Sequence, residues 1–291
     1  MTLLCAGEAF EDLIFVALER LPELGEEVKT DRFSATIGGG AVITAVKAAR
    51  LGMRTELISA LGPAAVTRLK KERVAVTNLL KPGEPHAITA ALSTGDDRAF
   101  VTFNGVNTKL EGRLAKRLAS LSRRSSSEVD ERRRTHFHLC FYPHSCQQWT
   151  AIVTKLRGRG ISVSWDFGWN EPLTNDRGLT DLIDSLDFVF INSREAALYT
   201  GTSSLQAAIP EWRKRTAITV IKLGDQGAVW LTPDRDILVP APKVKAIDTT
   251  GAGDSFNAGF LVAWMKGKTP EQCLAAGNKE GAESTKKAGG I

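Results

Sequence analysis

Short apolar runs of strand length alternate along the chain with longer stretches whose apolar residues recur at helical spacing. The runs predict strands at Leu3–Gly7, Thr55–Ala60, His136–Phe141, Ser162–Phe167, Phe188–Asn192, Ala217–Leu223 and Gly227–Leu231. The stretches predict helices near Ala41–Arg50, Gln147–Arg157, Arg194–Thr200 and Ser255–Trp264. Such alternation is typical of an α/β fold with a mainly parallel sheet flanked by helices. Ligands of such sheets bind beyond the carboxyl ends of the strands.

Two β-like segments interrupt this alternation, one at about Asp12–Phe33 and one at about Ala87–Phe103. The second contains a turn at residues 94–98. The chain has 291 residues, of which 43% are hydrophobic, so it can bury a full core. Length and composition fit one large α/β domain or one domain with an appendage.

The N-terminal apolar run is too short to cross a membrane, and acids follow it at Glu8, Glu11 and Asp12. We therefore expect a soluble, cytoplasmic protein without a membrane partner. The cysteines show no paired spacing, which favours reduced thiols. They are Cys5, Cys140, Cys146 and Cys273.

The net charge of +5 is mild, and several arginines fall in one segment. They are Arg123, Arg124, Arg132, Arg133 and Arg134. A nucleic-acid patch is one interpretation, but acids are interleaved with the arginines and no aromatic residue accompanies them as a stacking platform. A solvated surface loop is favoured, and we expect no nucleic-acid partner.

The most informative segment is the run DTTGAGDSF from Asp248 to Phe256, which leads into an apolar helical pattern. Small residues let a ligand approach the backbone, and the free N–H groups at a helix start attract negative charge. Asp254 could accept a proton from a substrate hydroxyl beside that cradle. The chemistry indicated is phosphoryl transfer from a nucleotide to an alcohol. The alternative is an ordinary capped helix after a turn.

The same segment resembles the C-terminal signature of the PfkB/ribokinase family of carbohydrate and nucleoside kinases, DTxGAGD followed by an apolar helix. The resemblance implies that Asp254 is the catalytic base and that the amides of Gly251, Ala252 and Gly253 form an anion hole. It extends in order from Gly7 to about Gly289. It implies one ribokinase-like kinase domain over residues 1–291, with a small β-sheet lid made from segments near 12–33 and 87–103. It also raises the expectation of a homodimer that forms through this lid.

A glycine turn at residues 38–40 enters an Ala-rich helix that Gly52 terminates, like the N-terminal signature of the family. The resemblance assigns the sugar to Asp12, Gly39 and Gly40. Relatives carry Asn at the position of Ile43, and ribokinase carries Lys where Gly40 stands and Asn where Phe10 stands. The loss of these polar groups predicts that ribose is disfavoured. The chain also departs from the family after Gly62, where Pro63–Val66 stands in place of a Gly-x-Asp-x-x-Gly stretch.

Further residues match nucleotide and metal positions of the family. Asn192 and Glu195 match its NxxE motif, which is tied to Mg²⁺, although the same spacing suits a capping box. The turn after Lys222, with Gly224 and Gly227, matches a GxxG turn beside the nucleotide, although most such turns are plain hairpins. The resemblance adds Asn278 as a contact of the adenine. The resemblance also implies ATP as cofactor. It implies a monovalent cation, expected to be K⁺, near Asp248 and Thr250.

Two other classes remain as alternatives to an ATP-dependent sugar kinase. A sugar or nucleoside sensor of the same fold is favoured by the lost polar groups but leaves the intact Asp254 segment unexplained. A Rossmann-type oxidoreductase is disfavoured, because the glycines at 38–40 lack the GxGxxG spacing. Zinc ligation by His136, His138 and Cys140 is also disfavoured, because three side chains along one strand face span too far to chelate a metal easily. The sequence names neither the acceptor nor the oligomeric state.

Overall fold

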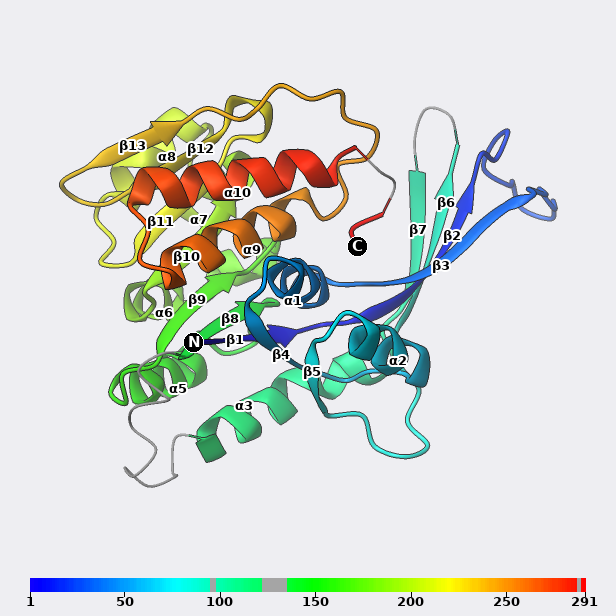
Figure 1. Ribbon diagram of the computed structural model, residues 1–291, viewed down its shortest axis with the longest axis horizontal. Coiled ribbons are helices and arrows are strands. Elements are labelled where there is room, and N and C mark those ends of the chain that lie inside the picture. The colour runs from blue at the N-terminus through cyan, green and yellow to red at the C-terminus, as the bar shows by residue number, and fades with distance from the viewer. Residues whose placement is uncertain (95–97, 122–134, 287–288) are drawn as a thin grey trace.

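The structure is a computed structural model that describes residues 1–94, 98–121, 135–286 and 289–291. A nine-stranded sheet forms its centre, in the order β13-β12-β11-β10-β9-β8-β1-β4-β5 (Figure 1). All neighbours from β11 to β5 are parallel, and β12 and β13 extend the sheet antiparallel. The strands are β1 (Thr2–Gly7), β4 (Arg54–Ser59), β5 (Ala75–Asn78), β8 (Thr135–Cys140), β9 (Ser162–Asp166), β10 (Phe188–Asn192), β11 (Ile218–Lys222), β12 (Ala228–Leu231) and β13 (Asp236–Val239).

Helices cover both faces of this sheet, because successive side chains of each strand point to opposite sides. In β1, Leu3 and Cys5 join one buried cluster, whereas Ala6 joins the other. The first cluster contains residues of α1 (Gly40–Arg50), α2 (Pro63–Lys71), α9 (Ala252–Met265) and α10 (Pro270–Ser284). The second contains residues of α3 (Leu110–Leu121), α5 (Cys146–Arg157), α6 (Leu179–Ser185), α7 (Ser193–Thr200) and α8 (Leu205–Trp212). The predicted α/β class with a mainly parallel, helix-flanked sheet is confirmed.

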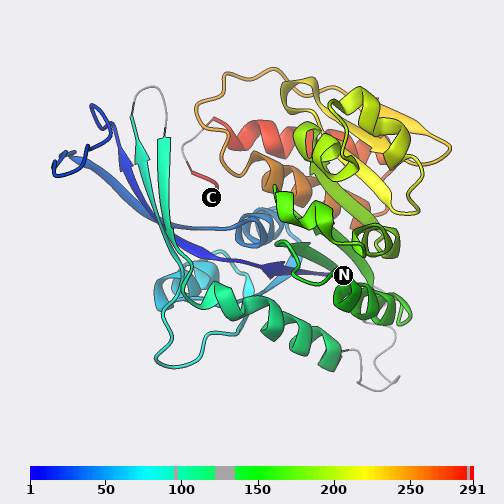
Figure 2. The ribbon, with the colours of Figure 1, turned by 180° about the vertical axis from the view of Figure 1, so that it is seen from behind.

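A separate four-stranded sheet, in the order β3-β2-β6-β7, projects from one edge of the molecule (Figures 1 and 2). Its strands are β2 (Phe10–Val16), β3 (Arg32–Gly38), β6 (Ile88–Ser93) and β7 (Arg98–Phe103). The separate sheet that the resemblance implies is therefore present. The first strand pair is wider than the predicted segment 12–33, because it begins at Phe10 and ends at Gly38. Residues 17–31 form no strand, since they carry a proline, a glycine and many acids.

The two faces of this four-stranded sheet, the expected lid, differ in the side chains that they carry. Asp12 pairs with Thr36 and Thr89, and Thr89 pairs with Thr102, so these four polar residues share one face. The opposite face is mostly apolar and carries Leu13, Phe15, Phe33 and Val101, together with Glu11. Among the described residues no helix is long and apolar enough to span a bilayer. The arginine cluster at 123–134 and residues 95–97 of the predicted turn lie outside the described residues.

Candidate active site

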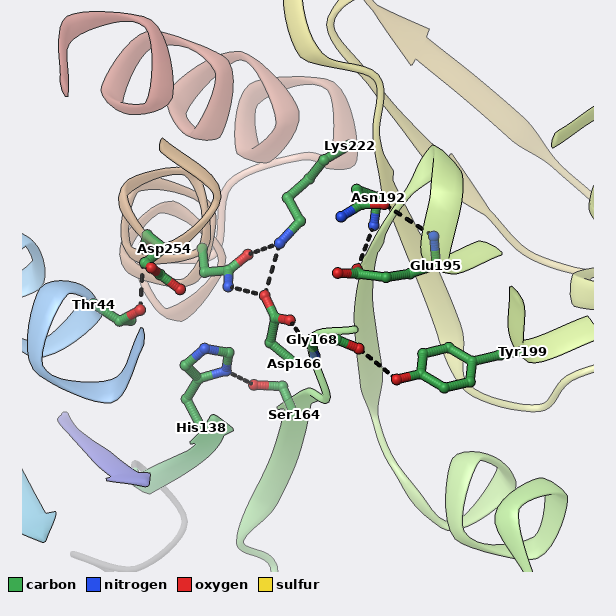
Figure 3. A network of polar contacts seen from close by, with 11 residues as sticks. Thr44, His138, Ser164, Asp166, Gly168, Asn192, Glu195, Tyr199, Lys222 and Asp254 are labelled. Atoms are coloured by element: carbon green, nitrogen blue, oxygen red, sulfur yellow. Dashed lines mark hydrogen bonds and ion pairs between the residues drawn. The ribbon is translucent and has the colours of Figure 1, made fainter. Parts of the chain in front are cut away.

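Three polar residues end neighbouring parallel strands of the main sheet. Asp166 ends β9, Asn192 ends β10 and Lys222 ends β11. Because these strands are adjacent and parallel, their last residues meet at one edge of the sheet. In Figure 3 the side chains of Asp166 and Lys222 point toward one another beside the start of α9, which carries Asp254. Candidate residues far apart in the sequence are thus brought together at the carboxyl edge.

The loop before α9 makes the glycine turn that the sequence predicts. Gly251 has φ of 72°, and an added Cβ would lie 2.8 Å from Cδ1 of Ile43, so a larger residue would be strained here. The helix begins at Ala252, so the amides of its first turn have no intrahelical acceptor. The Ala252 amide donates to the Thr249 carbonyl at 3.2 Å. Within the described part of the chain, the amides of Gly251 and Gly253 have no such acceptor, which leaves them more available to an anion.

Asp254 is in the first turn of α9 and packs against the start of α1. A Cβ on Gly40 would lie 2.8 Å from Asp254 Oδ1, so a glycine at this position makes room for the carboxylate. Thr44 Oγ1 donates to the backbone carbonyl of Asp254 at 3.2 Å and ties the two helices together. Burial, followed by the charge of Asp166, raises the pKa of Asp254 to about 6, although Lys222 opposes the shift. The carboxylate is thus ionised at neutral pH and basic enough to accept a proton.

A largely buried ion pair, whose side chains are 14% and 11% exposed, supports this site and was not predicted from the sequence. Lys222 Nζ donates to Asp166 Oδ2 at 2.7 Å, and Asn257 Nδ2 donates to the same oxygen at 2.7 Å. Burial opposes ionisation of Asp166, but Lys222 and Asn257 outweigh it and lower the pKa of Asp166. Burial likewise opposes the charge on Lys222, but Asp166 and the other carboxylates outweigh it and raise the pKa of Lys222. Both groups are therefore charged at neutral pH.

The sequence did hold signals for Asp166 and Asn257. Asp166 is an acid near the carboxyl end of a predicted apolar strand, the end at which ligands of parallel sheets bind. Asn257 follows Asp254 by three positions on a helix, a spacing that places both side chains on one side. Neither signal is specific, because isolated acids and amides are common at strand ends and on helices.

Asn192 and Glu195 form a complete capping box at the start of α7. Asn192 Oδ1 accepts hydrogen bonds from the amides of Arg194 and Glu195, both at 2.9 Å, and Glu195 Oε2 accepts one from the Asn192 amide at 2.8 Å. The structural alternative named above is therefore realised. Glu195 is nonetheless only 6% exposed, and burial, followed by the charge of Asp166, raises the pKa of its carboxyl. A helix cap alone does not require an acid this deeply buried beside other acids.

A cavity of about 570 Å³ opens beside the start of α9. It is lined by six of the residues assigned above to the nucleotide or the anion hole, Lys222, Gly224, Gly227, Ala252, Gly253 and Asn278. Asn278 Nδ2 donates to the carbonyls of Val239 at 2.8 Å and Pro240 at 3.3 Å. This residue therefore fixes the chain that follows β13 at the cavity wall. The cavity is large enough for a nucleotide-sized ligand.

The residues that the resemblance assigns to the sugar lie where the main sheet meets the four-stranded sheet. Asp12 packs against Gly38, and burial raises the pKa of its carboxyl to about 6. Gly39 has φ of 105° and packs against the backbone of Glu8. Ile43, predicted to be an apolar wall of the sugar pocket, is only 5% exposed, and its Cδ1 packs under Gly251. In both ribbon views the last described residues, 289–291, lie between the lid and α9 (Figures 1 and 2).

Asp248 and Thr250 hold the loop that precedes Gly251. Asp248 Oδ1 accepts hydrogen bonds from the Thr250 amide at 2.8 Å and from Thr250 Oγ1 at 2.7 Å. Asp248 Oδ2 accepts one from the Gly289 amide at 3.0 Å. These contacts connect the loop before Gly251 to the end of the described chain.

The two histidines of β8 are buried in the core and hydrogen-bonded to a neighbouring strand. His136 and His138 are at most 1% exposed, and both hydrogen-bond to Ser164 Oγ, at 2.7 and 2.8 Å. Burial lowers the pKa of both imidazoles, to about 4 for His138, so both are neutral at pH 7. In the described residues no group of three or more His, Cys, Asp or Glu could hold a metal ion. The cysteines there are free and buried. The zinc alternative gains no support.

A large, mainly parallel α/β sheet with a small separate sheet beside it is the architecture of sugar and nucleoside kinases of the ribokinase family. Residues 2–291 match the model of the pfkB family of carbohydrate kinases, and the chain belongs to that family. It is a sugar or nucleoside kinase.

Known relatives agree with this placement. The chain is similar to the nucleoside kinase of Methanocaldococcus jannaschii, with 29% identity over 276 residues that cover 92% of this chain and 85% of the relative. It is 26% identical to the ribokinase of Bacillus subtilis, over 94% of this chain and 89% of the relative. The crystal structure of the M. jannaschii nucleoside kinase superimposes with a TM-score of 0.78 at 25% identity, over 99% of this chain and 92% of that one.

Proposed function

We propose that this chain, as one kinase domain, transfers the γ-phosphoryl group of ATP to a hydroxyl of a sugar, free or within a nucleoside. The position of Asp254 carries the proposal. It is in the first turn of α9, next to Gly253, which lines the cavity of about 570 Å³, and it packs against Gly40 of the glycine turn that leads to the lid. A base placed there reaches a hydroxyl on one side and a phosphate on the other.

In the proposed reaction Asp254 accepts the proton of the acceptor hydroxyl as its oxygen bonds to the γ-phosphorus. The bond between that phosphorus and the bridging oxygen breaks, and its electron pair leaves with ADP. The amides of Gly251, Ala252 and Gly253 hold the negative charge of the transferring group. Lys222, Gly224, Gly227 and Asn278 hold the nucleotide, and Asp12, Gly39 and Gly40 hold the acceptor.

The chemistry of the site fits Mg²⁺. Three carboxylates, Asp166, Glu195 and Asp254, face one lysine, so negative groups outnumber the single cation of this network. The pKa values of Glu195 and Asp254 are raised, first by burial and then by the charge of Asp166. Oxygen donors of this kind suit magnesium, which neutralises nucleotide phosphates when bound. Asn192 and Glu195 would hold it through water. For K⁺, the loop fixed by Asp248 and Thr250 is the proposed site, and replacing potassium by a tetraalkylammonium salt tests it.

A purified-protein screen for ADP release tests the proposal. The acceptors are pentoses, hexoses, sugar phosphates, keto-deoxy acids and nucleosides, each with ATP and Mg²⁺. We expect release that requires one acceptor class, with ribose a poor acceptor. Binding of a sugar or nucleoside without any ADP release would instead support the sensor.

We further propose that the lid pairs with the lid of a second copy through its apolar face. Phe33 is 56% and Val101 is 66% exposed on that face, while Asp12 lies on the other. Sedimentation at micromolar concentration should give a dimer that Phe33→Glu converts to a monomer. A wild-type monomer would refute the pairing.

A further inference from the structure

Lys222 stands at the carboxyl end of β11, and its side chain runs along the start of α9. A Cβ built on Gly253 would lie 3.1 Å from Nζ, 3.7 Å from Cε and 3.8 Å from Cδ of this lysine. The aliphatic stem therefore covers Gly253, and the ammonium group reaches the first turn of the helix. Lys222 and Gly253 both line the cavity of about 570 Å³. The ammonium group is at the helix-start end of that cavity.

The ammonium group is held in place by two partners. It donates to Asp166 Oδ2 at 2.7 Å and lies 3.5 Å from Asn257 Oδ1. Asn257 also donates a hydrogen bond to Asp166. This bond holds the Asp166 carboxylate in the position from which it binds the lysine. An ammonium group has three hydrogens, and these contacts use at most two of them. In the part of the chain that the structure describes, no third acceptor is found for Lys222, so one hydrogen remains for a ligand in the cavity.

Charge makes this position significant. In the network of Figure 3 the only cation is Lys222, and it faces Asp166, Glu195 and Asp254. The γ-phosphoryl group would carry further negative charge into the same space. A fixed cation beside the helix-start amides stabilises the negative charge of the phosphoryl group. The effect is largest in the transition state of the transfer.

We propose that Lys222 is a catalytic residue that contacts the transferring phosphoryl group, and that Asp166 and Asn257 are positioning residues that hold its ammonium group there. This inference rests on the proposed kinase activity. It differs from a nucleotide-binding role because Lys222 then acts on the γ-phosphoryl group, which ATP has and ADP lacks. The bonds made and broken are those of the transfer described above, and Lys222 neither gains nor loses its proton.

A double variant separates this role from a structural one. Lys222→Met alone leaves Asp166 buried without its ion-pair partner, so it is destabilised whatever the lysine does in catalysis. Lys222→Met combined with Asp166→Asn removes both charges and keeps an amide beside Asn257. If Lys222 only neutralises Asp166, the double variant regains turnover.

The assay compares wild type, the double variant and Lys279→Met, which removes an exposed lysine of α10 as a control. We expect the double variant to remain folded and to lose kcat by about 10²–10³, the effect of removing one charge-stabilising donor. Its affinity for ADP should stay within about 3-fold of wild type, whereas a non-hydrolysable ATP analogue should bind at least 10-fold more weakly. Turnover and analogue affinity at the wild-type level in the double variant would overturn the inference. Absence of turnover in wild type would instead refute the proposed function.

Discussion

Replacing Asp254, the proposed base, should stabilise the fold while it greatly lowers turnover. Asp254 is partly buried beside Asp166 and ionised at neutral pH, and its pKa is raised from 3.8 to about 6. In Asp254→Asn the side chain keeps its size but carries no charge at any pH. The folded variant therefore avoids the cost of ionising a buried carboxyl.

The size of the gain follows from the pKa shift. A shift of about two units corresponds to about 3 kcal/mol, because one unit is worth 1.36 kcal/mol. The attraction between Asp254 and Lys222, which Asn loses, is already included in that shift. The sign follows from linkage. The unfolded chain releases the proton near pH 4 and the folded chain near pH 6, so ionisation costs the wild type stability that grows over this interval and is constant above it. The advantage of the variant is absent below about pH 4 and complete above about pH 6.

Urea denaturation followed by tryptophan fluorescence measures this advantage, with Asp234→Asn as a control at an exposed acid. We expect the variant to exceed wild type by about 2–3 kcal/mol in unfolding free energy at pH 8 and by about half as much at pH 5. The control should match wild type at both values. A variant less stable than wild type at pH 8, or a difference independent of pH, would show that Asp254 is not held as a buried carboxylate.

Three further predictions concern catalysis. The kcat/KM of the wild type should fall below about pH 6 as Asp254 is protonated, and this acidic limb should persist in Asp12→Asn, which removes an acid whose pKa is also raised to about 6. A limb that disappears in Asp12→Asn would assign it to Asp12 instead. Asp12→Asn itself should raise the KM of the acceptor about 10-fold or more, by the loss of a hydrogen bond to a charged group, and leave the KM of ATP unchanged. Glu195→Gln should raise the Mg²⁺ concentration for half-maximal rate several-fold, and EDTA should stop transfer; unchanged metal dependence would leave Glu195 as a helix cap alone.

The main sheet was predictable because its strands are apolar runs of the right length, each followed by a turn or helix. Asn192 and Lys222 could be placed at strand ends for the same reason. Elements with a weaker apolar pattern were not predicted. Ala75–Asn78 is a four-residue edge strand with little buried surface, and Pro270–Ser284 is a helix rich in Ala and Gly with a weak apolar pattern.

The connections inside the site could not be derived from the sequence. That Asp166 pairs with Lys222, 56 positions away, depends on the order of β9, β10 and β11 in the sheet. The packing of Ile43 under Gly251 depends in the same way on how α1 docks against α9. Sequence spacing limits which residues share one element, whereas packing decides which elements meet.

The most direct test of the account is the turnover of Asp254→Asn on the acceptor that the screen identifies, measured together with its affinity for ADP. The account predicts that kcat falls by about 10²–10⁴, the usual contribution of a general base, while ADP binds within about 3-fold of wild type. Turnover close to that of wild type would contradict the account, because an enzyme that depends on Asp254 as its general base cannot keep its turnover without this carboxylate.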